Sequence, residues 1–118
     1  MADYKETLRR FALSDERFME TRLAMGPEAA NVSALDPKTH ALVRLGAALA
    51  IDAAPSSYQS AVEPALAAGA TIDEVVDTLI AVASTIGSAR VVSAAPELAL
   101  ALGYDVAVAM ETRDEDVQ

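Results

Sequence analysis

Apolar residues recur along this chain at spacings of three and four, which is the period of an α-helix. No stretch alternates apolar and polar residues between turn signals, so we expect no β-strand. Helices are expected within residues 4–12, 15–25, 37–51, 55–68, 72–86 and 91–102. The pattern therefore predicts an all-α fold, a compact bundle of about five or six helices.

Several helix boundaries carry their own signals. Asp36 followed by Pro37 is an acidic cap with proline at the first helical position. Thr71 and Glu74 have the spacing of a capping box, in which each side chain bonds the backbone amide of the other residue. Ser14 is expected to cap the second helix. These local signals define the helix starts independently of the apolar pattern.

The third expected helix is apolar on nearly every side. Between residues 41 and 51 only Arg44 interrupts the apolar run. A helix that is apolar all round is typical of a buried, central position. The run is far shorter than the roughly 20 residues that a bilayer span requires. We therefore expect a central core helix and no membrane association.

Composition narrows the possible functions. The 118-residue chain is 53% hydrophobic but only 4% aromatic, and its formal net charge is −9. Its length fits one domain. Within this domain we expect N-terminal helices in residues 1–34 that pack on the core, a helical core in residues 35–103 and a short acidic tail in residues 104–118. An acidic surface repels phosphate backbones, so we expect no nucleic-acid partner. The charged start lacks the apolar stretch of a signal peptide, and a cytoplasmic protein is expected.

The chain contains no cysteine and a single histidine. Without cysteine, disulfides, thiolate nucleophiles and thiolate metal sites are all excluded. One histidine leaves little for a transition-metal site, and no glycine-rich phosphate loop is present. We therefore expect neither a metal nor a cofactor.

Three short segments occur in the order typical of one known family. Residues 35–42 read LDPKTHAL, residues 65–71 read ALAAGAT, and residues 72–76 read IDEVV. In this order they resemble the core of the carboxymuconolactone decarboxylase and alkyl hydroperoxidase D-like family. The resemblance covers about residues 35–103 and implies the helical fold of that family.

The resemblance also indicates where the family's reactive groups would lie. Its redox branch carries a Cys-x-x-Cys-x-x-x-His motif, which falls on Ala54, Ser57 and Ala61, or one residue earlier in a second alignment. The glutamate of that branch falls on Ala41. The histidine of the decarboxylase branch is replaced as well. A thiol peroxidase is therefore excluded, because no thiolate or resolving disulfide can form.

Six other polar residues are candidates for a site that uses no thiol. The catalytic candidates are His40, Tyr58 and Ser57, and the substrate-binding candidates are Arg44, Arg90 and Gln59. His40 and Arg44 lie one helical turn apart. Together they can hold a small carboxylate, and His40 can also move a proton. The structural alternatives stay open: an ordinary ion pair for Arg44, and helix capping by Ser57.

Arg90 stands alone in an apolar helix. An unpaired guanidinium in such a place is costly, so it must have a partner. That partner is a substrate carboxylate, a same-chain acid such as Asp77 or Glu97, or an acid of another subunit. The sequence does not choose among them.

Two functions remain open at this point. The first is a cofactor-free enzyme of decarboxylase or lyase type, or a binder, that acts on a small carboxylate-bearing metabolite. The second is a catalytically silent oligomeric scaffold or binding protein that keeps the fold. The high apolar share favours a homo-oligomer, because a chain of this size cannot hide that much surface in one core. The resemblance implies a trimer or a hexamer.

Overall fold

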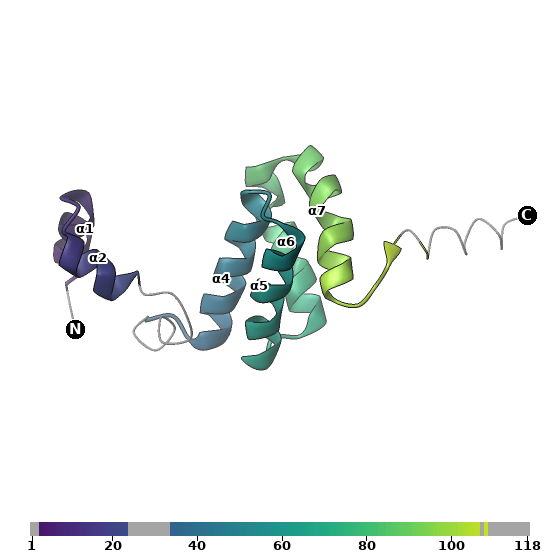
Figure 1. Ribbon diagram of the computed structural model, residues 1–118, viewed down its shortest axis with the longest axis horizontal. Coiled ribbons are helices and arrows are strands. Elements are labelled where there is room, and N and C mark those ends of the chain that lie inside the picture. The colour runs from purple at the N-terminus through teal and green to yellow at the C-terminus, as the bar shows by residue number, and fades with distance from the viewer. Residues whose placement is uncertain (1–2, 24–33, 107, 109–118) are drawn as a thin grey trace, which may run out of the picture. The chain divides into compact units, whose positions relative to one another are not determined.

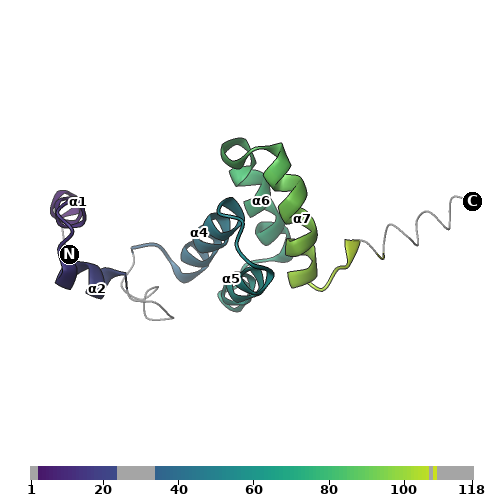
Figure 2. The ribbon, with the colours of Figure 1, turned by 45° about the horizontal axis from the view of Figure 1, so that its top comes forward.

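The computed structural model describes residues 3–23, 34–106 and 108. Within these residues it contains six α-helices and no strand, which confirms the all-α class. Figures 1 and 2 show the helices in two views. The chain divides into two compact units, Met1–Asp36 and Pro37–Gln118. Each unit is described by itself.

The N-terminal unit is a pair of short helices, α1 (Tyr4–Ala12) and α2 (Glu16–Arg22). The rings of Phe11 and Phe18 meet edge to face, with their centroids 5.1 Å apart. No residue of either helix is fully buried. The pair is therefore held by this ring contact and by surface polar contacts, because it has no core of its own.

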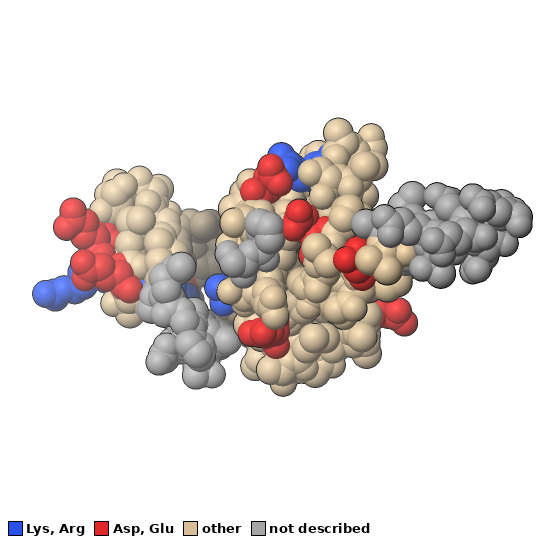
Figure 3. Space-filling model, turned by 45° about the vertical axis from the view of Figure 1, so that its right-hand side comes forward, with Lys and Arg blue, Asp and Glu red and all other residues tan. Residues whose placement is uncertain are grey.

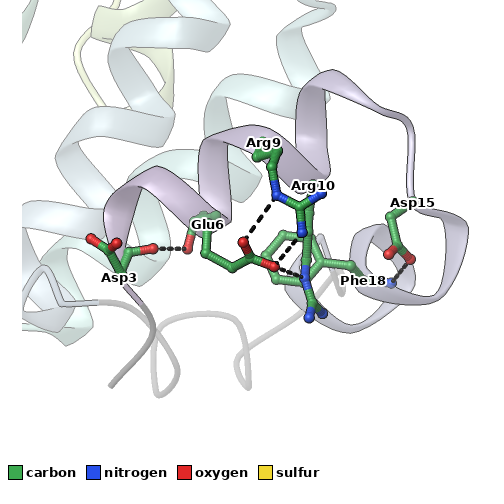
Figure 4. Close-up of polar contacts among 7 residues, drawn as sticks. Asp3, Glu6, Arg9, Arg10, Asp15 and Phe18 are labelled. Atoms are coloured by element: carbon green, nitrogen blue, oxygen red, sulfur yellow. Dashed lines mark hydrogen bonds and ion pairs between the residues drawn. The ribbon is translucent and has the colours of Figure 1, made fainter.

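The surface contacts of α1 centre on Glu6. Its carboxylate accepts hydrogen bonds from Arg9 at 2.7 Å and from Arg10 at 2.9 Å (Figure 4). These two bonds lower the pKa of Glu6 to about 2. The carboxylate therefore stays ionised across the whole physiological pH range.

The cap of α2 differs from the expected one. Asp15, not Ser14, accepts a hydrogen bond from the backbone amide of Phe18, at 3.0 Å (Figure 4). Ser14 has a φ of 56°, so it turns the chain in the left-handed region and lacks the extended backbone of an N-cap. The helix ends at Arg22, before the expected stop at Gly26, which lies outside the described residues.

Four helices make up the second unit. They are α4 (Pro37–Ala50), α5 (Pro55–Ala67), α6 (Ile72–Ile86) and α7 (Ser88–Ala101). α4 packs against α5 and α6, and α7 packs against the same two helices. Pro37 and Pro55 are each the first residue of their helix, as the sequence predicts. Gly87, at a φ of 87°, makes the sharp turn from α6 to α7.

The capping box at the start of α6 is confirmed. The Thr71 hydroxyl accepts from the Glu74 amide at 3.0 Å, and the Glu74 carboxylate accepts from the Thr71 amide at 2.9 Å. The Thr71 amide and the ammonium of Lys38, 2.9 Å from Glu74, lower the pKa of Glu74 below its ordinary value. One acidic side chain thus caps α6 and joins it to the first turn of α4.

Replacing Thr71 by alanine should lower the free energy of unfolding by about 1 kcal/mol, because it removes the cap of α6. Urea unfolding at pH 7 measures this loss.

The contribution of Glu74 to the free energy of unfolding should depend on pH. Its folded-state pKa lies below the ordinary 4.5, so its stabilisation is complete above that value and is lost as pH falls through the folded pKa. Urea unfolding of the wild type and of Glu74→Gln at pH 7 and pH 3 tests this. If the wild type and Glu74→Gln differ in unfolding free energy by the same amount at pH 7 and at pH 3, the expected pH dependence is wrong.

The core of the second unit consists mostly of small and medium-sized side chains. It comprises Ala41, Leu45, Leu49, Tyr58, Val62, Ala65, Ala70, Val75, Leu79, Ala94 and Leu98. Small residues allow the helices to approach closely. At Gly46, where α4 meets α6, an added Cβ would lie 3.3 Å from Cγ1 of Val82.

The expectation that the third predicted helix is buried all round is wrong. In α4 only Ala41, Leu45, Gly46 and Leu49 are buried, whereas Val43 is 57% exposed. The reason is geometric: α5 and α6 are the main neighbours of α4, and they cover only part of its circumference. None of the helices within the described ranges is long and apolar enough to cross a membrane.

Candidate functional site

An ion pair joins the turn between α4 and α5 to the first turn of α7. Nη1 of Arg90 lies 2.7 Å from Oδ1 of Asp52, with side-chain exposures of 30% and 60%. Arg90 thus has a same-chain acid as its partner, although not Asp77 or Glu97. A cation in the first turn of a helix opposes the helix dipole. The Asp52 carboxylate offsets this unfavourable charge.

Tyr58, in the first turn of α5, is 1% exposed. Its hydroxyl is buried and makes no hydrogen bond within the described part of the chain. Burial raises the pKa of Tyr58, the charge of Asp52 raises it further, and Arg90 acts in the opposite direction. The phenol is therefore protonated at neutral pH, with a donor that no described group accepts.

A hollow lies beside Arg90. It has a volume of about 380 Å³ and is lined by Ile86, Ala89, Arg90 and Ser93. Ligand pockets typically have volumes of about 300–1,000 Å³, so this hollow is large enough for a small organic acid. Its one charged lining residue, Arg90, has the sign that attracts a carboxylate.

The structure places the cationic pair on α4 away from this region. His40 lies in the first turn of α4 and is half-buried, and Arg44, one turn later, is exposed. From His40 to the end of α4 is ten residues, or about 15 Å of helix, and the turn that leads to α5 lies beyond that end. His40 and Tyr58 are therefore at opposite ends of the α4–α5 pair.

The remaining two candidates lie on the surface of α5. Ser57 is exposed, and its backbone amide donates to the carbonyl of Ala54 at 2.8 Å. Gln59 is exposed and donates to the carboxylate of Glu63 at 3.4 Å. Of the six candidates, the structure thus brings Tyr58 into the electrostatic range of Arg90. His40 lies at the other end of α4, and Ser57 and Gln59, although next to Tyr58 in sequence, are exposed on α5.

The family model for the carboxymuconolactone decarboxylase family matches residues 16–100 of the chain. The protein belongs to this family. The match begins at the first residue of α2 and so extends beyond the core that the sequence motifs indicated. Neither the comparison with individual curated proteins nor that with individual solved structures gives a match.

This family member has no cysteine, so it lacks the Cys-x-x-Cys pair of the redox branch. The resemblance placed that pair on Ala54 and Ser57, or one residue earlier, which is the end of the turn that contains Asp52 and the first turn of α5. In the described residues, no group of three or more His, Cys, Asp or Glu side chains is placed to hold a metal ion. The ionisable groups that the structure brings together near this turn are the phenol of Tyr58, the guanidinium of Arg90 and the carboxylate of Asp52.

Sequence reasoning missed Asp52 as a site residue. One signal was available, because Asp52 is the only charged residue between Arg44 and Glu63. A lone charge in a long apolar stretch needs a partner for the same reason as Arg90 does. Because Asp52 and Arg90 are both isolated and have opposite charges, their ion pair could have been predicted from the sequence.

A second, larger concavity runs between α4 and α6. It has a volume of about 520 Å³ and is lined by Thr39, Leu42, Val43, Gly46, Ala47, Ala50, Thr78, Ala81, Val82, Thr85 and Ile86. None of these residues is charged, although acidic side chains are spread over the face of the bundle drawn in Figure 3. The ion pair of Lys38 and Glu74 lies at the N-terminal ends of the two helices. We call this surface the α4–α6 groove.

Proposed function

We propose that this protein binds a small carboxylate-bearing molecule at the end of the bundle where Arg90 and Tyr58 lie, and that it uses no thiol chemistry there. The observation that carries the proposal is the Tyr58 hydroxyl, which is buried and protonated and has no described acceptor. A buried donor without a partner costs about 1–3 kcal/mol. Buried polar groups without a partner are rare in folded proteins, and a bound ligand is one way to supply the missing acceptor.

The chemistry of the surrounding groups supports an acid as the ligand. A guanidinium offers several N–H donors that match a carboxylate, and a phenol adds one more. The hollow of about 380 Å³ provides space for the ligand beside Arg90. Tyr58 does not line this hollow, so binding requires a local opening that lets the ligand reach the buried phenol. With His40 at the other end of α4, a decarboxylase or lyase reaction would depend on Tyr58 as the proton-bearing group, and not on a Ser57–His40 pair.

Replacing Tyr58 by phenylalanine should separate stability from binding. We expect the variant to gain about 1 kcal/mol in unfolding free energy, because it removes an unpaired buried hydroxyl. The same change should weaken ligand binding. Thermal unfolding with a panel of aromatic and aliphatic monocarboxylates and dicarboxylates at millimolar concentration measures both effects, since a ligand that binds only the folded state raises the melting temperature.

Two arginine variants test whether the ligand binds at the Arg90 end or at the His40 end of the bundle. Arg90→Ala should abolish the ligand-induced rise in melting temperature, and Arg44→Ala, which removes the same charge from the exposed surface of α4, should retain it. If Arg44→Ala abolishes the rise and Arg90→Ala does not, the ligand binds beside His40. If no acid in the panel raises the melting temperature, the proposal fails.

The α4–α6 groove favours a second function, that of an oligomeric scaffold or binding protein without catalysis. An uncharged concavity is unusual on the surface of a strongly acidic chain, and monomers rarely expose large apolar patches. A homo-oligomer, as a trimer or a hexamer, would cover this surface. The two functions are compatible, because the groove and the Arg90 hollow have only Ile86 in common.

A further inference from the structure

We infer that Asp52 is an internal competitor of the ligand carboxylate for Arg90, and that it sets how tightly the site binds anions. The inference rests on the proposed function and adds a specificity-determining residue to it. It starts from the position of Arg90, which pairs with Asp52 and also lines the hollow. One guanidinium therefore faces an internal carboxylate and the space for an external one.

Asp52 and the ligand carboxylate would compete for the positive charge of Arg90, and not for its N–H donors. A guanidinium has five N–H donors, so two carboxylates can bond it at once. It has only one positive charge, however, and Asp52 already neutralises it at 2.7 Å. An anion entering the hollow would meet a neutral pair and the repulsion of Asp52. The Asp52 carboxylate therefore lowers the affinity of the site for anions.

Of the two residues in the Arg90–Asp52 ion pair, Asp52 can leave the pair at the lower free-energy cost. Its side chain is 60% exposed, against 30% for Arg90. A largely exposed carboxylate regains its hydration readily when it leaves an ion pair. Glu97, the other acid whose charge acts on Tyr58, is half-buried on α7 and makes no ion pair within the described residues. The geometry thus assigns the exchangeable role to Asp52.

The backbone at Asp52 makes a clean variant available. Its φ of 58° lies in the left-handed region, which asparagine adopts with little strain. Asp52→Asn therefore removes the charge and keeps the turn. Asp77→Asn is the matched control, because it removes one negative charge from an exposed position on α6 that lines neither concavity.

The experiment is calorimetric titration of the full chain with sodium benzoate and with sodium succinate at low ionic strength. Benzamide serves as the neutral analogue of benzoate. Asp52→Asn should bind benzoate about fivefold more tightly than the wild type, which is the change expected for an ion pair of this exposure. Asp77→Asn should remain within twofold of the wild type, and benzamide should show no difference between the variants.

The outcomes separate this inference from the proposed function. If Arg90→Ala abolishes benzoate and succinate binding but Asp52→Asn leaves both affinities unchanged or weaker, the site exists and Asp52 does not compete for it. If Asp52→Asn and Asp77→Asn strengthen binding equally, the effect is one of net charge, and the inference is again wrong. If neither the wild type nor Asp52→Asn binds either acid, the proposed function and the inference both fail.

Discussion

Replacing Leu45 by alanine should lower the free energy of unfolding by about 3 kcal/mol, the usual cost of a cavity in a tight core. Leu45 is 0% exposed at the centre of the second unit, whereas Val43, two residues earlier on the same helix, is 57% exposed. Val43→Ala should therefore change the stability of the dissociated chain by less than about 0.5 kcal/mol. Urea unfolding followed by circular dichroism, with a dilution series to exclude effects of association, measures both variants. Equal losses would show that α4 is buried on both faces.

The different exposures of Leu45 and Val43 also show what the sequence cannot predict, namely which side of α4 faces the core. Every position between Arg44 and Asp52 is apolar or glycine, so the pattern of α4 has no polar face that would reveal which side meets the core. Periodicity locates a buried face only where polar residues mark the opposite one. In α6 the capping box could be predicted because all its atoms lie within four consecutive residues.

The candidate site was predictable to a smaller extent, because its contacts are long-range. Arg90 and Tyr58 could be selected individually, since each is a polar group in an apolar stretch. Their relation to Asp52 depends on how the α4–α5 turn meets the start of α7, and no local spacing encodes that. The spacing of His40 and Arg44 predicts that they lie one turn apart on a helix, and α4 confirms it. Their distance from Tyr58 depends on how α4 packs against α5, which no local spacing encodes.

We expect the protein to form a homo-oligomer through the α4–α6 groove. Light scattering behind a sizing column should give a mass several times that of a single 12.3 kDa chain. Two copies of a chain with a net charge of −9 repel each other, so they can meet most easily where a surface carries no unpaired charge. The groove meets this condition, because its lining is uncharged and Lys38 and Glu74 pair at the N-terminal ends of its helices.

The shape of the groove favours a symmetric contact between copies. Val43 lies on the same face of α4 on which Gly46, Ala47 and Ala50 leave a depression. A two-fold axis, which a hexamer can contain and a trimer cannot, would insert each valine into the depression of the other copy. Val43→Asp places an unpaired charge there and should weaken association by about 3 kcal/mol, or roughly a hundredfold. Val92→Asp is the control, since Val92 is 73% exposed on α7 and lies outside the groove. A wild-type mass near one chain at micromolar concentration would refute the oligomer, and equal dissociation by both variants would place the interface elsewhere.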